Sequence, residues 1–161
     1  MKRLASIFFI SAIILSLIGC SGDKNLEELL DYINNDITGL STLEEQISSS
    51  FNSIVAASSN EDEYQKKVTT TMNLIIQLNS EATKISYTLK NEELIELHNQ
   101  YIDYTNQLLS AFSMLTSAIQ TGDESLLDSF DAKIEEAIDT YEEYEKDFEA
   151  LLDKYSLNTK K

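Results

Sequence analysis

The chain has 161 residues, with 28 acidic residues against 12 basic ones, one histidine, one cysteine, no proline and no tryptophan. Its formal net charge of -16 repels phosphate and argues against nucleic-acid partners, and a single cysteine cannot form an internal disulfide. The length fits one globular domain.

The first 19 residues have the layout of an export signal. Lys2 and Arg3 precede an apolar run over 4–18 that contains no charged residue, and polar residues follow Cys20 at once. A helix that spans a bilayer needs about 20 apolar residues, and this run is shorter. We therefore predict a cleaved signal peptide at 1–19; the alternative is a signal-anchor helix in which Cys20 is only a small apolar residue.

The end of this signal, Leu17-Ile18-Gly19-Cys20, resembles the lipobox of bacterial lipoproteins at all four positions. In that family the cysteine thiol receives a diacylglycerol, with fatty acids such as palmitate, and a peptidase cuts before the cysteine. The resemblance implies cleavage between Gly19 and Cys20, a covalent lipid on Cys20 and a short tether at 20–24. Two or more acyl chains hold a protein on a membrane stably.

The chain is also similar in size, signal and composition to small helical lipoproteins of Gram-positive bacteria. This resemblance implies a lipid anchor on the extracytoplasmic face of the cell membrane; Ser21 after the cysteine also allows the inner leaflet of an outer membrane. Cleavage would remove Lys2 and Arg3 but no acidic residue, so ten basic residues would remain against 28 acidic ones, a net charge of -18.

Four stretches of helical periodicity follow the tether. Their apolar residues recur at alternating steps of three and four over 26–54, 68–89, 94–118 and 127–155. The first apolar stripe consists of Leu26, Leu30, Ile33, Ile37, Leu40, Ile47, Phe51 and Ile54. We expect four helices.

Capping residues mark the boundaries of these helices. Asn60, Asn91 and Asp123 are residue types whose side chains accept hydrogen bonds from free amides at a helix start, and acidic residues follow each of them. Gly122 is suited to the left-handed stop of the third helix.

Gly39 is the weak point of the first helix. Ser41 with Glu44 three residues later matches a capping box, which could restart the helix there. We predict one helix, and the sequence leaves open whether it is continuous through Gly39.

The registers predict how the helices pair. In an antiparallel hairpin the numbers of facing residues add to a constant, which is 119 for the first pair, 183 for the middle pair and 245 for the last. Half of each constant falls in a predicted turn, at 59–60, 91–92 and 122–123. The expected fold is an all-α, antiparallel up-down-up-down four-helix bundle with coiled-coil-like packing over 25–157, followed by a tail at 158–161.

The chain offers little catalytic or metal-binding chemistry. Ile95 stands three residues before His98, where a di-iron bundle needs Glu. No calcium loop, phosphate loop or nucleophile-base arrangement is present in the sequence. We interpret His98 as a boundary residue with one nitrogen in water, and we expect a non-enzymatic protein without a metal or any cofactor beyond the lipid.

One internal feature is unusual, because the 245 register brings four tyrosines to facing core positions: Tyr101, Tyr104, Tyr141 and Tyr144. One interpretation is core packing with the hydroxyls at the rim; the other is a small-ligand pocket or partner region. We expect Gly39 and Ala82 to give the rings room and Asn79 to satisfy a hydroxyl.

These patterns favour a membrane-tethered envelope interaction or structural lipoprotein, with a small-ligand-binding or sensor bundle as the alternative. The partner would be the membrane plus an unidentified envelope protein, and the sequence leaves the oligomeric state open. An up-down bundle collects six lysines at the tethered end, which would suit an anionic membrane. They are Lys24, Lys84, Lys90, Lys154, Lys160 and Lys161.

Overall fold

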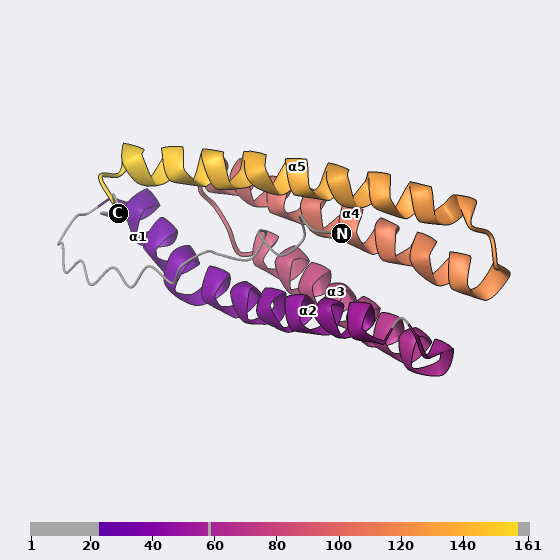
Figure 1. The fold of residues 1–161 in the computed structure, drawn as a ribbon. Coiled ribbons are helices and arrows are strands. Elements are labelled where there is room, and N and C mark those ends of the chain that lie inside the picture. The colour runs from indigo at the N-terminus through magenta and orange to yellow at the C-terminus, as the bar shows by residue number, and fades with distance from the viewer. Residues whose placement is uncertain (1–22, 58, 158–161) are drawn as a thin grey trace.

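The protein, in a computed structural model, is described over residues 23–57 and 59–157 (Figure 1). The elements are α1 (Lys24–Asp31), the π-helical segment η2 (Tyr32–Ile37), α2 (Thr38–Ala56), α3 (Glu61–Ser86), α4 (Glu92–Thr121) and α5 (Ser125–Lys154). The first three follow one another without a break, so the described chain forms four antiparallel rods. The predicted all-α four-helix bundle is confirmed. The predicted signal 1–19, its cleavage residue Gly19, Cys20 and the tail 158–161 lie outside the described residues.

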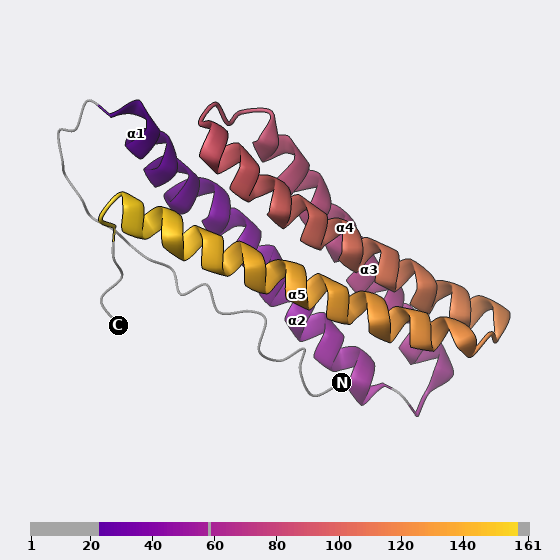
Figure 2. The same cartoon turned by 90° about the horizontal axis from the view of Figure 1, so that it is seen from above.

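Helices that follow one another along the chain pack closest: α2 against α3, α3 against α4 and α4 against α5. The first and the last long helices of the bundle, α2 and α5, lie apart in Figure 1 and cross at an angle in Figure 2. Aromatic rings span the distance between the first rod and α5, where Tyr32 and Phe148 meet edge to face with ring centroids 6.4 Å apart.

The predicted register of the last two helices is confirmed by ring contacts. Tyr104 lies opposite Tyr141 with centroids 4.8 Å apart, and Tyr101 lies opposite Tyr144 at 5.2 Å. Both pairs obey the constant of 245, which follows from the heptad spacing together with the short turn after Gly122.

The other two registers agree with the structure to within two residues. The Asn79 amide on α3 donates to the Thr105 hydroxyl on α4 at 2.8 Å, and the hydroxyls of Ser50 on α2 and Thr71 on α3 lie 2.7 Å apart. These hydrogen bonds join neighbouring rods and fix their relative position along the bundle axis.

The caps form largely as predicted. The Asn60 side chain accepts from the Glu63 amide at 3.2 Å and the Asn91 side chain from the Glu93 amide at 3.0 Å. Asp123 accepts from the backbone N–H of Ser125 at 3.0 Å, at the residue where α5 begins. Gly122 ends α4 in the left-handed region with φ 71°.

The first rod is continuous through Gly39, and the capping box at Ser41 and Glu44 does not form. The Ser41 hydroxyl instead donates to the carbonyl of Thr38 at 3.1 Å, and Glu44 is buried. Gly39 is exposed, with no atom near the place a Cβ would take, so the expectation that it gives space to the rings is wrong.

The irregularity of this rod lies one turn earlier, in the π-helical η2. A π-turn holds one more residue than an α-turn, so the buried stripe moves by one position on its N-terminal side. Leu29 and Tyr32 are fully buried there, whereas the predicted core residue Leu30 is only partly buried. The π-segment thereby turns Tyr32 into the core.

Most other predicted core positions are buried, but Met72 on α3 is only partly buried beside the buried Thr71, and several positions near the helix ends are accessible. Leu127, expected to begin the last apolar stripe, is 41% exposed. Leu26 and Phe51 pack only partly against the core. Helix ends have fewer neighbouring rods to cover them, which explains why these positions remain accessible to solvent.

The C-terminal helix ends in a Schellman motif. Ser156 adopts a left-handed conformation with φ 56°. The Leu157 N–H donates to the carbonyl of Leu152 at 2.9 Å, and the Leu157 side chain is buried. The buried core therefore extends to Leu157.

We use the term proximal end for the end of the bundle that holds the start of α1, the α3–α4 turn and the end of α5. The Glu28 carboxylate on α1 accepts from the backbone N–H groups of Lys90 at 2.5 Å and Asn91 at 3.1 Å. Lys154 on α5 forms an ion pair with Glu93 on α4. These contacts join three rods at one end.

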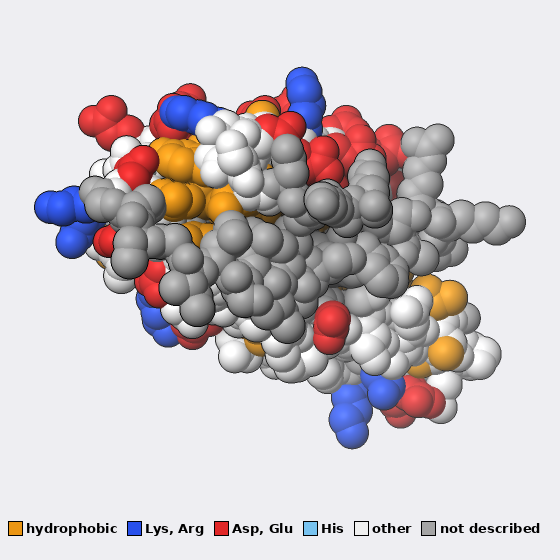
Figure 3. Space-filling model, turned by 90° about the vertical axis from the view of Figure 1, so that its left-hand side faces the viewer, with side chains coloured by type: hydrophobic (Ala, Val, Ile, Leu, Met, Phe, Trp, Pro, Cys, Tyr) orange, Lys and Arg blue, Asp and Glu red, His pale blue; other side chains and the backbone are white. Residues whose placement is uncertain are grey.

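The proximal end carries both lysines and acidic residues. The described lysines there are Lys24, Lys84, Lys90 and Lys154, and they are outnumbered by Asp23, Glu27, Glu28, Glu81, Glu92, Glu93 and Asp153. Figure 3 looks onto this end and shows acidic and basic side chains interspersed, with hydrophobic side chains between them. The four described lysines lie at the end where they were expected, but acidic residues outnumber them there.

Within the described residues, no helix combines the length and the apolar composition needed to cross a bilayer.

Candidate functional site

The four predicted tyrosines meet in one region of the core, which we call the tyrosine cluster: Tyr101, Tyr104, Tyr141 and Tyr144. All four are buried, and their rings pack at tilted or edge-to-face angles with centroids 4.8–6.5 Å apart. Such offset arrangements are the favourable ones for aromatic rings. The hydroxyls do not reach a solvent-exposed rim, so that part of the core-packing interpretation is wrong.

Tyr32 extends the tyrosine cluster from the other side of the bundle. Its hydroxyl lies 3.4 Å from that of Tyr144 and 2.9 Å from Nδ1 of His98. The burial of Tyr32 could not be predicted from the apolar stripe, because an unbroken α-helix places Tyr32 beside that stripe; the π-segment η2 brings it into the core.

His98 is fully buried, and the expectation of one nitrogen in water is wrong. Its Nε2 lies 2.7 Å from the carbonyl oxygen of Ala82, which can only accept, so Nε2 carries the proton. In the neutral ring Nδ1 then accepts from the Tyr32 hydroxyl, and Tyr144 donates to Tyr32. The result is a directed chain from Tyr144 through Tyr32 and His98 to Ala82.

Burial decides the protonation state of this chain. Desolvation lowers the pKa of His98 below its ordinary value of 6.5, and the hydrogen bond to Ala82 offsets only part of that effect. Desolvation also raises the pKa of Tyr32 and of Tyr144 far above 10. The side chains of Tyr144, Tyr32 and His98 in this hydrogen-bonded chain are therefore uncharged near neutral pH.

Glu44 is an acidic side chain inside this core, and only 3% of it is exposed. The Tyr101 hydroxyl donates to its Oε1 at 2.8 Å. Desolvation raises the pKa of Glu44 to about 7, against the lowering effect of the Tyr101 hydrogen bond, and the charge of Glu145 raises it further. Glu44 occupies the step between Leu40 and Ile47 in the first apolar stripe, and that spacing is the signal that could have found it.

Two hydroxyls of the tyrosine cluster, those of Tyr104 and Tyr141, have no hydrogen-bond partner among residues 23–57 and 59–157. Asn79, expected to satisfy one of them, instead donates to Thr105 and to Asn106 at 2.8 and 2.9 Å. A buried polar group without a partner costs about 1–3 kcal/mol. These two hydroxyls are the unsatisfied part of the network.

The histidine and the carboxyl of this core are already hydrogen-bonded within the protein. Both nitrogens of His98 are occupied by Tyr32 and Ala82, and Glu44 is bonded to Tyr101. In residues 23–57 and 59–157 no group of three or more His, Cys, Asp or Glu side chains could hold a metal ion.

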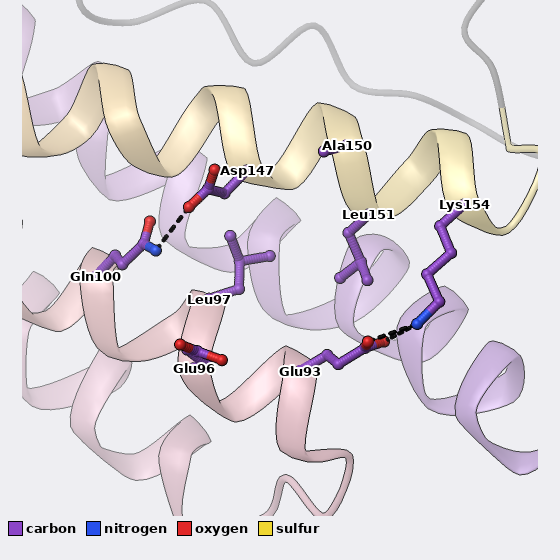
Figure 4. A pocket seen from close by; sticks show the side chains of 8 residues that line it. All are labelled: Glu93, Glu96, Leu97, Gln100, Asp147, Ala150, Leu151 and Lys154. Carbon is purple, nitrogen blue, oxygen red and sulfur yellow. Dashed lines mark hydrogen bonds and ion pairs between the residues drawn. The ribbon is translucent and has the colours of Figure 1, made fainter.

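Two open grooves run along the outer surface between α4 and α5. The one in Figure 4, of about 350 Å³, contains the ion pair between Lys154 and Glu93 and a hydrogen bond of 2.9 Å from Gln100 to Asp147. The other, of about 440 Å³, is lined by Gln100, Asp103, Asn106, Gln107, Ser110, Lys133, Thr140 and Glu143. In the groove of Figure 4, polar side chains already bond one another across the helix pair, which helps to hold α4 and α5 together.

Comparison with known proteins returned no matching family model, no matching curated protein and no matching solved structure.

Proposed function

We propose that this chain is a membrane-tethered, extracytoplasmic lipoprotein whose non-catalytic helical bundle serves as an envelope interaction or structural protein. The observation that carries the proposal is the lipobox from Leu17 to Cys20 at the end of a charged, then apolar leader. Helix α1 starts at Lys24, so only a few residues separate the lipidated cysteine from the bundle.

The chemistry of the core supports a non-catalytic role. His98 spends both ring nitrogens on internal hydrogen bonds, and Glu44 is bonded to Tyr101 among buried rings. A general acid or base must reach the proton it transfers in the substrate. Neither group is placed to do so while the rods are packed.

Metabolic labelling with a fatty acid tests the lipid anchor. Cells that produce the wild-type chain should incorporate the label into the protein, and the Cys20→Ala chain should not. Ser21→Ala is the matched control, since it changes the adjacent residue and leaves the lipobox intact. Label retained in the Cys20→Ala chain would end the lipoprotein proposal.

Crosslinking in intact cells, with the Cys20→Ala chain as the untethered control, then captures the envelope partner.

A second candidate function is a sensor that binds a small polar ligand in the tyrosine cluster. The observation in its favour is the pair of unpartnered hydroxyls on Tyr104 and Tyr141, near the buried Glu44. A polar compound that raises the melting temperature of the wild-type chain, but not of a chain carrying both Tyr104→Phe and Tyr141→Phe, supports the sensor. A rise that survives both substitutions places the ligand elsewhere and refutes this candidate site.

A further inference from the structure

Tyr87 is the outlier among the large hydrophobic side chains on the surface. It is 82% exposed, whereas the other exposed members of this class in the part of the chain that the structure describes, Val55, Ile76 and Leu127, are between 41 and 48% exposed. Tyr87 follows the last residue of α3 and stands at the tip of the α3–α4 turn. The described fold gives its ring nothing to pack against.

The turn that carries Tyr87 is held without the ring. The backbone N–H of Tyr87 donates to the carbonyl of Lys84 at 3.2 Å, and the Thr88 hydroxyl and N–H both donate to Ile85. Leu89 packs partly against the core below. These contacts fix the turn and leave the aromatic side chain directed outward, so its exposure is a feature of an ordered segment.

The turn also lies close to the tether. Glu28, one turn into α1, accepts hydrogen bonds from the N–H groups of Lys90 and Asn91. Cys20 precedes Asp23 by three residues, which reach at most about 10 Å when fully extended. A lipid on Cys20 therefore holds the α3–α4 turn near the lipid headgroups.

We propose that the α3–α4 turn, residues 87–91, docks on the headgroup region of the phospholipid bilayer that holds the Cys20 lipid, with Tyr87 as the interfacial anchor. This inference rests on the proposed function. Tyrosine is enriched at membrane-water interfaces because its ring is apolar and its hydroxyl is polar.

The lysines beside Tyr87 assist this contact, and the overall charge does not drive it. Lys90, in the turn, and Lys24 can extend their amines toward phosphate groups while their stems stay along the protein. The Lys84 amine is instead paired with Glu81 at 2.7 Å. The acidic residues of the proximal end repel an anionic surface. The bilayer contact therefore depends on two features. The tether keeps the turn at a high local concentration next to the bilayer, and the ring of Tyr87 inserts at the interface.

The natural absence of tryptophan allows a direct test. Tyr87→Trp places one fluorescent reporter on the turn, and Val55→Trp places one at the opposite end of the bundle on a side chain that is also exposed. The chain from Cys20 onward contains every helix and every core residue that the structure describes. Its sole cysteine can be coupled to maleimide lipid in phosphatidylcholine and phosphatidylglycerol vesicles whose acyl chains carry bromine quenchers near the headgroups.

On coupling, the Tyr87→Trp chain should lose more than half of its emission and shift it to shorter wavelength, and the Val55→Trp chain should keep its emission. Unchanged emission from Tyr87→Trp, or equal quenching of both chains, would overturn the docking of the turn. Because the coupling is chemical, this result does not depend on acylation in cells. A chain that is not acylated in cells contradicts the proposed function alone.

Discussion

Replacing Glu44 by glutamine removes the buried carboxyl while keeping its shape and an oxygen that can accept from Tyr101. The folded-state pKa of Glu44 is about 7, against an ordinary value of 4.5. Between these pH values the folded protein binds more protons at Glu44 than the unfolded chain does. The contribution of this carboxyl to the free energy of unfolding is therefore fully present below about pH 4.5 and is lost as the pH rises through about 7. The difference corresponds to about 3 kcal/mol, since one pKa unit is about 1.4 kcal/mol.

Urea denaturation followed by circular dichroism measures this effect when wild type and Glu44→Gln are compared at several pH values. The glutamine amide leaves its own donors to satisfy, so the variant is expected to be somewhat less stable than wild type in acid. The free energy of unfolding of Glu44→Gln, taken relative to that of wild type at the same pH, should increase by about 3 kcal/mol between about pH 4.5 and about pH 8. Glu45→Gln, at the neighbouring exposed position, is the matched control and should show a much smaller change.

The comparison isolates Glu44 from other groups that titrate in the same range. Burial also raises the pKa of Asp36 and Glu145, and it lowers that of His98, whose contribution to stability is lost as the pH falls below about 6.5. These groups are present in both proteins and cancel in the difference. If the relative stability of the variant did not change with pH, Glu44 would not be a desolvated carboxyl in the core.

Three further predictions concern the same core and the glycines. Tyr104→Phe removes an unpartnered hydroxyl and should stabilise the protein by up to about 1 kcal/mol, whereas Tyr104→Ala should cost about 3–5 kcal/mol in the same urea titration. Tyr32→Phe leaves Nδ1 of His98 without its donor and should cost about 1–3 kcal/mol; a stability equal to wild type would contradict the hydrogen-bonded chain. Gly39→Ala should raise stability by up to about 1 kcal/mol and Gly122→Ala should lower it by about the same amount, because only Gly122 has a positive φ; melting curves that shift in the same direction would contradict this difference.

The regular parts of the fold could be predicted from the sequence because each depends on local chemistry. Heptad spacing determines which face of each helix is buried, and the caps at Asn60 and Asn91 determine where helices begin. Since the turns are short, the heptads of neighbouring helices can meet in only one register, which places Tyr104 opposite Tyr141.

The irregular parts could not be predicted in the same way. A π-turn adds one residue without a distinctive sequence pattern, so the burial of Tyr32 depends on packing against His98 and Phe148, which are distant in the sequence. Glu44 was missed because an acidic residue at a core position breaks the apolar pattern. The polar network in the tyrosine cluster arises from these two exceptions.

The mass of the N-terminal fragment of the protein purified from its own cell membranes tests the central claim most directly. The account predicts a chain that begins at Cys20, without residues 1–19, and carries the mass of a diacylglycerol on the thiol. A chain that retains residues 1–19, or one that begins at Cys20 with a free thiol, would contradict a lipoprotein tethered through this cysteine.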